Sequence, residues 1–126
     1  MQKIKIVTTV KSMLADVFTP VGIYLRLRDR FRDTILLEST DNHAAENSWS
    51  FIGVNAIGGV EISAGDAIDL KLPGQTAQQI ELNKQQKVVD VLNNFMQQFE
   101  VTPAAEKEAR YAQGLYGYTT YDAIRF

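Results

Sequence analysis

Cysteine is absent from the 126 residues of this chain. The chain therefore forms no disulfide, has no thiol nucleophile and offers no thiolate to a metal, and nothing indicates an oxidising compartment. No apolar run approaches the ~20 residues that span a bilayer, and residues 1–10 lack the apolar core of a secretory signal. We therefore expect a cytoplasmic protein.

Histidine occurs once, as His43, within a polar segment. Nucleophilic catalysis by a serine needs a base beside it, and no partner for His43 can be named from the sequence. Asp41, His43 and Glu46 also lack the spacing of a known metal site. A histidine in such a loop is more often solvated than catalytic. We predict neither a catalytic nor a metal-binding residue in this chain.

Basic residues do not outnumber acidic ones. The 13 lysines and arginines face 15 aspartates and glutamates, which gives a net charge of −2 and argues against a dedicated nucleic-acid binder. Arg26, Arg28, Arg30 and Arg32 alternate, and on a strand they would share one face that could bind phosphate or a partner. The other interpretation is a solvated helix end, where arginines complement the helix dipole. We prefer the helix end, because Asp29 and Asp33 lie among the arginines.

Apolar residues make up 45% of the chain, enough for the core of one modest domain over residues 1–126. Their periodicity predicts an α+β domain, with mainly antiparallel strands and helices packed on them. The predicted strands cover residues 4–10, 34–38, 48–54, 57–63 and 67–72, and residues 111–126 also have a strand-like pattern. We expect the strands at 34–38 and 48–54 to be buried. A short helical turn capped by Ser12 is predicted over residues 12–17.

Two longer helices are predicted. Thr19 is a good N-cap and Pro20 suits the first helical position, so we favour a helix over residues 20–28 although Ile23, Leu25 and Leu27 alternate as in a strand. In the second helix, apolar residues recur at spacings of three and four, which predicts a face packed in the core. Asn83 is its predicted N-cap and Pro103 follows its end; the apolar residues are Val88, Leu92, Phe95, Met96 and Phe99.

Glu38 and Ser39 follow the apolar residues of the predicted strand at 34–38. An acid and a hydroxyl at such a position usually form local hydrogen bonds at a strand end. The alternative is that they hold an ammonium group, to which the carboxylate supplies charge and the hydroxyl a directional hydrogen bond. From composition and spacing alone, the strand-end interpretation is preferred.

Four motifs, in order, resemble the N-terminal region of anthranilate synthase component I, the large chorismate-utilising subunit of tryptophan biosynthesis. The resemblance spans residues 13–126, and residues 60–111 contribute little to it. The motifs are Thr19-Pro20-Val21 with Tyr24-Leu25, then Leu36-Leu37-Glu38-Ser39, then Ser50-Phe51-Ile52-Gly53, then Gly117-Tyr118 with Tyr121-Asp122.

The resemblance implies an enzyme that converts chorismate to anthranilate and pyruvate with Mg²⁺, using ammonia from a glutamine amidotransferase subunit. It places chorismate and the metal in a C-terminal catalytic domain outside these residues, so the chain alone should be inactive and should carry no cofactor. Because Ile124, Arg125 and Phe126 end the chain without turn residues or a polar tail, we expect a truncated N-terminal domain.

In the family, the serine of the Leu-Leu-Glu-Ser motif contacts tryptophan, the feedback inhibitor, and the adjacent acid belongs to the same pocket. The resemblance therefore assigns tryptophan binding to Ser39 and Glu38. Family members often have a basic residue two positions before the serine of the Ser-Phe-Ile-Gly motif. Here that position is Ser48, which can hydrogen-bond a carboxylate without the help of a positive charge.

Two alternatives to this assignment stay open. The nearest enzyme is aminodeoxychorismate synthase component I, which shares the architecture. The other is a free-standing module that binds an amino acid. A domain without its partner domain should also expose apolar surface and self-associate.

Overall fold

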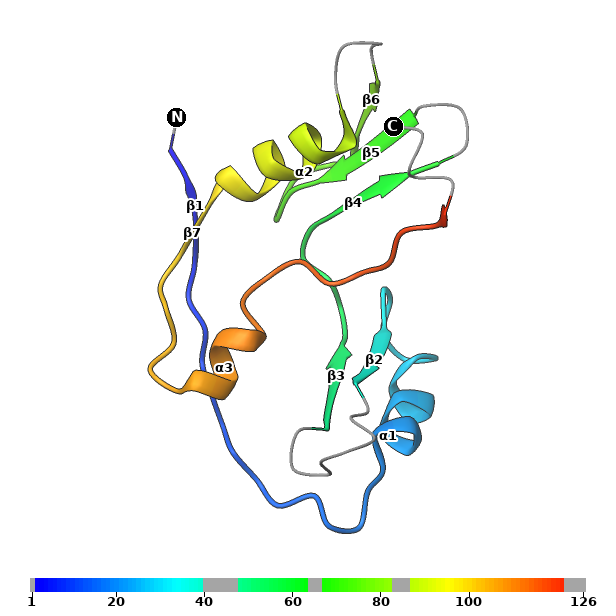
Figure 1. Ribbon diagram of the computed structural model, residues 1–126, viewed down its shortest axis with the longest axis vertical. Helices are drawn as coiled ribbons and strands as arrows, with labels where there is room; N and C mark the ends of the chain where they lie inside the picture. Colours follow the sequence, from blue (N-terminus) through cyan, green and yellow to red (C-terminus); the bar gives the residue numbers. More distant parts are fainter. Residues whose placement is uncertain (1, 40–47, 64–66, 83–86, 122–126) are drawn as a thin grey trace. The chain divides into compact units, whose positions relative to one another are not determined.

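The computed structural model describes residues 2–39, 48–63, 67–82 and 87–121. Residues 11–56 form one compact unit, and residues 1–10 together with 57–126 form another (Figure 1). Each unit contains at least one helix and at least two antiparallel strands, which confirms the predicted α+β class.

In the unit of residues 11–56, helix α1 (Pro20–Leu27) begins where the sequence predicts. The backbone N–H of Gly22 donates to Thr19 Oγ1 at 3.1 Å, so Thr19 is the N-cap, and Pro20 occupies the first helical position. The helix interpretation of this segment is confirmed. The strand-like alternation was overruled because the cap and the proline fix the backbone at the start of a helix.

Residues 12–17 form no helix, and that prediction is wrong. The segment is irregular up to a turn at residues 16–17, and Met13, Leu14 and Val17 are 71%, 84% and 80% exposed. Nucleating a single helical turn loses more conformational entropy than its one hydrogen bond offsets. Without burial of these apolar side chains, nothing compensates that cost.

Strands β2 (Ile35–Ser39) and β3 (Trp49–Gly53) form an antiparallel ribbon, and α1 contacts both strands. The two predicted strands are thus confirmed, but their predicted burial is wrong. Their residues are half-buried or exposed. A two-stranded ribbon has too little packed surface around it to exclude water from both of its faces.

The other unit contains an antiparallel sheet in the order β4–β5–β6, made of β4 (Gly59–Ile62), β5 (Ala67–Lys71) and β6 (Gln78–Glu81). The first two strands confirm the sequence prediction. β6 was missed because three of its four residues are polar and all four are exposed, so the segment lacks the apolar alternation that identifies a strand. It pairs with β5 as an edge strand.

The core of this unit joins the sheet to helix α2 (Val88–Gln97). Ile68 of β5 and Phe95 of α2 are each 1% exposed, and Val91 is also buried. The predicted apolar face is only partly correct, because Met96 is 49% exposed and Val91 takes a buried position. The N-cap is Lys87, whose N–H donates to Asp90 Oδ2 at 3.3 Å; the predicted cap, Asn83, lies outside the described residues.

Strand β7 (Phe99–Val101) follows α2 and pairs in parallel with β1 (Ile4–Ile6). The predicted first strand is confirmed over these three residues. Phe99, expected on the helix, belongs instead to β7, and its ring meets Phe95 edge to face with centroids 5.2 Å apart. A parallel pair of two short segments so distant in the chain leaves no local signal in the sequence.

Helix α3 (Lys107–Tyr111) precedes residues 112–121, which contain no strand, so the strand-like interpretation of this stretch is wrong over its described part. Instead, the Gln113 amide helps to hold the chain here, together with a hydrogen bond that Arg110 Nε donates to the Ala104 carbonyl at 2.8 Å. Gln113 donates from Nε2 to Thr8 Oγ1 and to the Thr102 carbonyl, both at 2.8 Å, and its Oε1 accepts from the Ala104 N–H at 3.1 Å. The amide thus ties three separate segments of the unit together.

Candidate functional site

The residues that the sequence singles out lie together at one end of the β2–β3 ribbon. Glu38 and Ser39 are the last two residues of β2, and Ser48 immediately precedes β3. All three side chains are exposed to solvent. The intervening residues 40–47, with Asp41, His43 and Glu46, lie outside the described part of the structure.

Glu38 and Ser39 point to opposite faces of the ribbon. Successive side chains on a strand alternate between faces, whereas residues directly opposite each other on paired strands share one face. The register pairs Ser39 with Trp49 and Glu38 with Ser50. The ribbon end therefore has one face carrying Ser39 and Trp49 and another carrying Glu38 and Ser50.

On its own face, Glu38 has a neighbour that sequence reasoning did not identify. The Ser50 hydroxyl donates to Glu38 Oε1 at 3.3 Å, a long and exposed hydrogen bond. The pairing could have been found by aligning the two apolar stretches as a hairpin, which brings Leu36 opposite Ile52 and Glu38 opposite Ser50. This hydrogen bond runs across the ribbon and links the carboxylate to its cross-strand neighbour.

The face with Ser39 combines a hydroxyl with an aromatic surface. Trp49, the only tryptophan of the chain, lies directly opposite Ser39 and is 44% exposed. Phe51 and Leu37 continue this face toward the other end of the ribbon and are half-buried. A hydroxyl beside an indole ring can hydrogen-bond an amine while the ring packs against an apolar or aromatic group.

The arginines that alternate in the sequence do not share a strand face. Arg26 lies in the last turn of α1, with its guanidinium 5.7 Å from the ring centroid of Phe18. Arg28 caps the helix, and Arg30 and Arg32 follow in the turn before β2. The preferred helix-end interpretation therefore fits Arg26 and Arg28 but not the other two.

Within the described ranges, no three histidine, aspartate or glutamate residues lie close enough to hold a metal ion. The resemblance assigns its magnesium ion to a C-terminal domain outside these residues. The same part of the chain contains no helix long and apolar enough to cross a bilayer.

Curated proteins that match this chain carry the name anthranilate synthase component 1. The protein from Neisseria meningitidis serogroup B is 31% identical over 115 residues, which are 91% of this chain and 22% of that protein. The protein from Mycobacterium tuberculosis is 34% identical over 64 residues, 51% of this chain and 12% of that protein. The protein from Mycolicibacterium smegmatis is 38% identical over 52 residues, 41% of this chain and 10% of that protein.

These matches confirm the resemblance drawn from the four motifs, and they fall in the N-terminal region of the relatives. The chain spans about a fifth of the length of the Neisseria relatives and less of the mycobacterial ones. No family model matches the chain. No solved structure matches it significantly.

Proposed function

We propose that this chain, which is similar to the N-terminal region of anthranilate synthase component 1, is the tryptophan-binding regulatory domain of such an enzyme. Residues 1–126 would act as one domain of a longer protein in the cytoplasm. The rest of that protein would bind chorismate and Mg²⁺ and form anthranilate and pyruvate. The ammonia would come from a glutamine amidotransferase subunit. This chain would have no catalytic activity alone.

The observation that supports this proposal most directly is the position of Ser39. One of the four motifs that carry the resemblance ends on this residue, and the hydroxyl is exposed at the end of β2. It lies opposite an exposed indole ring, that of Trp49. Tryptophan presents an ammonium group close to an aromatic side chain, so a hydroxyl and an indole on one face complement it.

In this proposal, the other two predicted residues have different roles. Ser48, at the start of the same ribbon end, would hydrogen-bond the carboxylate of tryptophan without the charge that a basic residue supplies. Glu38 faces away from Ser39 and already accepts a hydrogen bond from Ser50. Its negative charge would favour binding of the ammonium group by about 1 kcal/mol or less, because water screens the attraction between exposed charges.

Feedback inhibition would then follow from differential binding. Tryptophan held at the end of the β2–β3 ribbon would favour one arrangement of the complete enzyme, in which the distant active site is not competent. Such a ligand shifts the equilibrium only by the difference between its affinities for the two arrangements. The complete pocket would need residues beyond this chain, so these residues alone should bind tryptophan weakly.

The test replaces Ser39 by alanine in the complete enzyme. Loss of a hydrogen bond to a charged amine costs about 1.5–3 kcal/mol, so the tryptophan concentration for half-inhibition should rise roughly tenfold to a hundredfold. Turnover without tryptophan should be unchanged. The matched control is Ser50→Ala, the same change on the opposite face of the ribbon, which should shift inhibition far less.

Wild-type tryptophan sensitivity in Ser39→Ala would show that this serine does not bind the inhibitor. The identity of the aminobenzoate product decides between the two enzymes of similar architecture. Anthranilate is the ortho isomer, and formation of para-aminobenzoate would instead indicate an aminodeoxychorismate synthase. Chorismate turnover by these 126 residues alone would contradict the regulatory assignment.

A further inference from the structure

The last residue pair of the β2–β3 ribbon places a hydroxyl beside an aromatic ring. Ser39 lies directly opposite Trp49 in the register, and the Cβ atoms of residues paired in this way are about 4.5–5.5 Å apart. Trp49 is 44% exposed, so a large part of its side chain reaches solvent. The other face of the same ribbon end carries Glu38 and Ser50. One face of the ribbon end therefore combines a small polar group with an aromatic surface.

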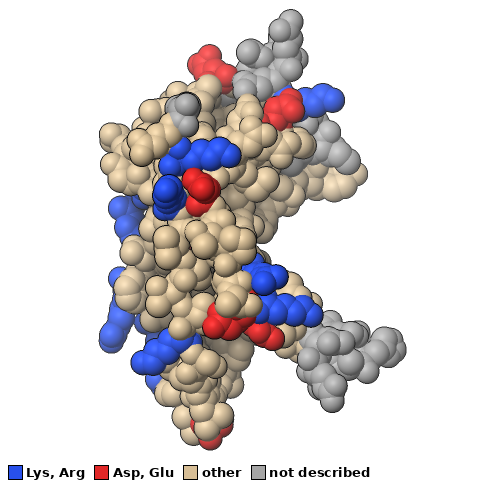
Figure 2. Space-filling model, turned by 90° about the vertical axis from the view of Figure 1, so that its left-hand side faces the viewer, with Lys and Arg blue, Asp and Glu red and all other residues tan. Residues whose placement is uncertain are grey.

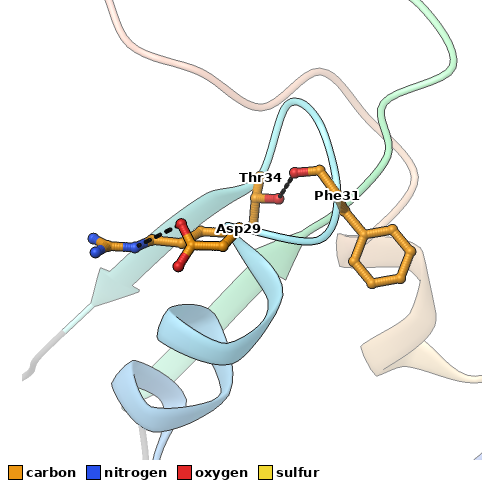
Figure 3. Close-up of polar contacts among 4 residues, drawn as sticks. Asp29, Phe31 and Thr34 are labelled. Atoms are coloured by element: carbon orange, nitrogen blue, oxygen red, sulfur yellow. Dashed lines mark hydrogen bonds and ion pairs between the residues drawn. The ribbon is translucent and has the colours of Figure 1, made fainter.

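Hydrogen bonds at the opposite end of the ribbon support this register. Thr34 Oγ1 donates to the Phe31 carbonyl at 3.0 Å, where the chain enters β2 (Figure 3). The Asn55 N–H donates to the Arg32 carbonyl at 3.0 Å and joins the chain after β3 to the chain before β2. A slip of one residue between the strands would move Trp49 to the other face. The ribbon thus presents the ring and the hydroxyl together from a defined backbone.

The three residues predicted to bind tryptophan are polar and do not by themselves select one amino acid. Ser39, Ser48 and Glu38 offer two hydroxyls and a carboxylate, which suit the ammonium and carboxylate groups that all free amino acids share. Basic and acidic side chains are interspersed on the face visible in Figure 2, which favours neither charge in the side chain of a ligand. Trp49 adds an exposed apolar surface against which that side chain can pack.

We infer that Trp49 is the residue of this chain that makes the proposed effector site selective for amino acids with an aromatic side chain. This inference rests on the proposed function. In an aromatic amino acid, only Cα and Cβ separate the ammonium nitrogen from the ring. A ligand whose ammonium group binds the Ser39 hydroxyl therefore brings its ring to the neighbouring Trp49. The two rings pack in an offset stack or edge to face, the arrangements that aromatic pairs prefer.

The experiment measures the concentration of L-tryptophan that half-inhibits the complete enzyme, with ammonia as the nitrogen source. For Trp49→Leu, this concentration should rise about threefold to tenfold, because the contact between the two rings is lost. Trp49→Phe keeps an aromatic ring and should stay within about twofold of the wild-type value. The matched control is Phe31→Leu, which removes a ring of similar exposure, 42%, at the opposite end of the ribbon and should leave inhibition unchanged.

A double variant separates a direct contact of Trp49 from an effect transmitted through Ser39. If the ring binds the ligand's side chain and the hydroxyl binds its ammonium group, the two losses are independent. Ser39→Ala with Trp49→Leu should then raise the half-inhibition concentration by the product of the two single changes. A double variant inhibited as strongly as Ser39→Ala alone would show that Trp49 only positions the serine, and it would overturn the inference.

Two other results would overturn it as well. One is wild-type sensitivity to tryptophan in Trp49→Leu, and the other is an equal loss of sensitivity in Phe31→Leu. If leucine at position 49 prevents folding, Trp49→Thr takes its place, because threonine suits a strand, and the same rise is expected.

Ser39→Ala reports on the proposed function separately. If Ser39→Ala weakens inhibition and Trp49→Leu does not, the inference about Trp49 fails and the proposed function stands. If both variants keep wild-type sensitivity, the proposed tryptophan site fails, and the inference fails with it.

Discussion

Replacing Phe95 by alanine should remove a large part of the stability of the unit that contains α2. The side chain is 1% exposed, and only Ile68 among the described residues is buried as completely. Truncating a buried phenylalanine costs about 3–5 kcal/mol, because apolar surface is lost and a cavity remains. The edge-to-face contact with Phe99 places this case toward the upper end of that range.

Small domains have a free energy of unfolding of about 5–15 kcal/mol, so Phe95→Ala should lower the unfolding midpoint strongly. Urea unfolding followed by far-ultraviolet circular dichroism measures the change. The control is Val89→Ala on the same helix, at a residue 60% exposed, where a change within about 0.5 kcal/mol is expected. If both variants unfolded at the same urea concentration, the assignment of Phe95 to the core would be refuted.

Two further predictions concern the same unit. A Cβ added at Gly58 would lie 2.8 Å from the Lys71 carbonyl oxygen, so Gly58→Ala should destabilise the fold by about 1–3 kcal/mol. The control is Gly59→Ala, which should not destabilise it because nothing lies within 4 Å of the added Cβ. Equal melting temperatures of the two variants would contradict the contact at Gly58. Gln113→Ala should lower the free energy of unfolding by about 2–3 kcal/mol, because loss of its three hydrogen bonds leaves the Ala104 N–H and the Thr102 carbonyl without this partner. Faster amide exchange at Ala104 would report that loss, and unchanged exchange would show that Gln113 does not hold this segment.

Elements with strong local signals were predictable from the sequence. Helix α1 followed from Thr19 and Pro20, whose preferences act on the backbone directly. The ribbon strands and α2 followed from the spacing of apolar residues, which reflects the geometry of each element. The exposure of Met96 and the burial of Val91 were not predictable, because the face that a helix buries depends on what packs against it.

Where the outcome depended on distant partners, sequence reasoning was wrong or incomplete. Residues 12–17 have a helical pattern but no apolar surface covering them, so they form no helix. The largely polar strand β6 exists because β5 offers it hydrogen bonds. The pairing of β1 with β7 joins residues almost a hundred positions apart, and no short-range pattern encodes such a contact.

The candidate site shows the same division between local and tertiary information. The sequence alone predicted the end of the ribbon and the motif that ends on Ser39. It also predicted the resemblance that the curated relatives confirm. The strand pairing decided that Ser39 shares a face with Trp49 and that Glu38 lies with Ser50 on the other. A chain can specify which residues follow one another, but the register between two strands sets which side chains meet, because each strand alternates its side chains between two faces.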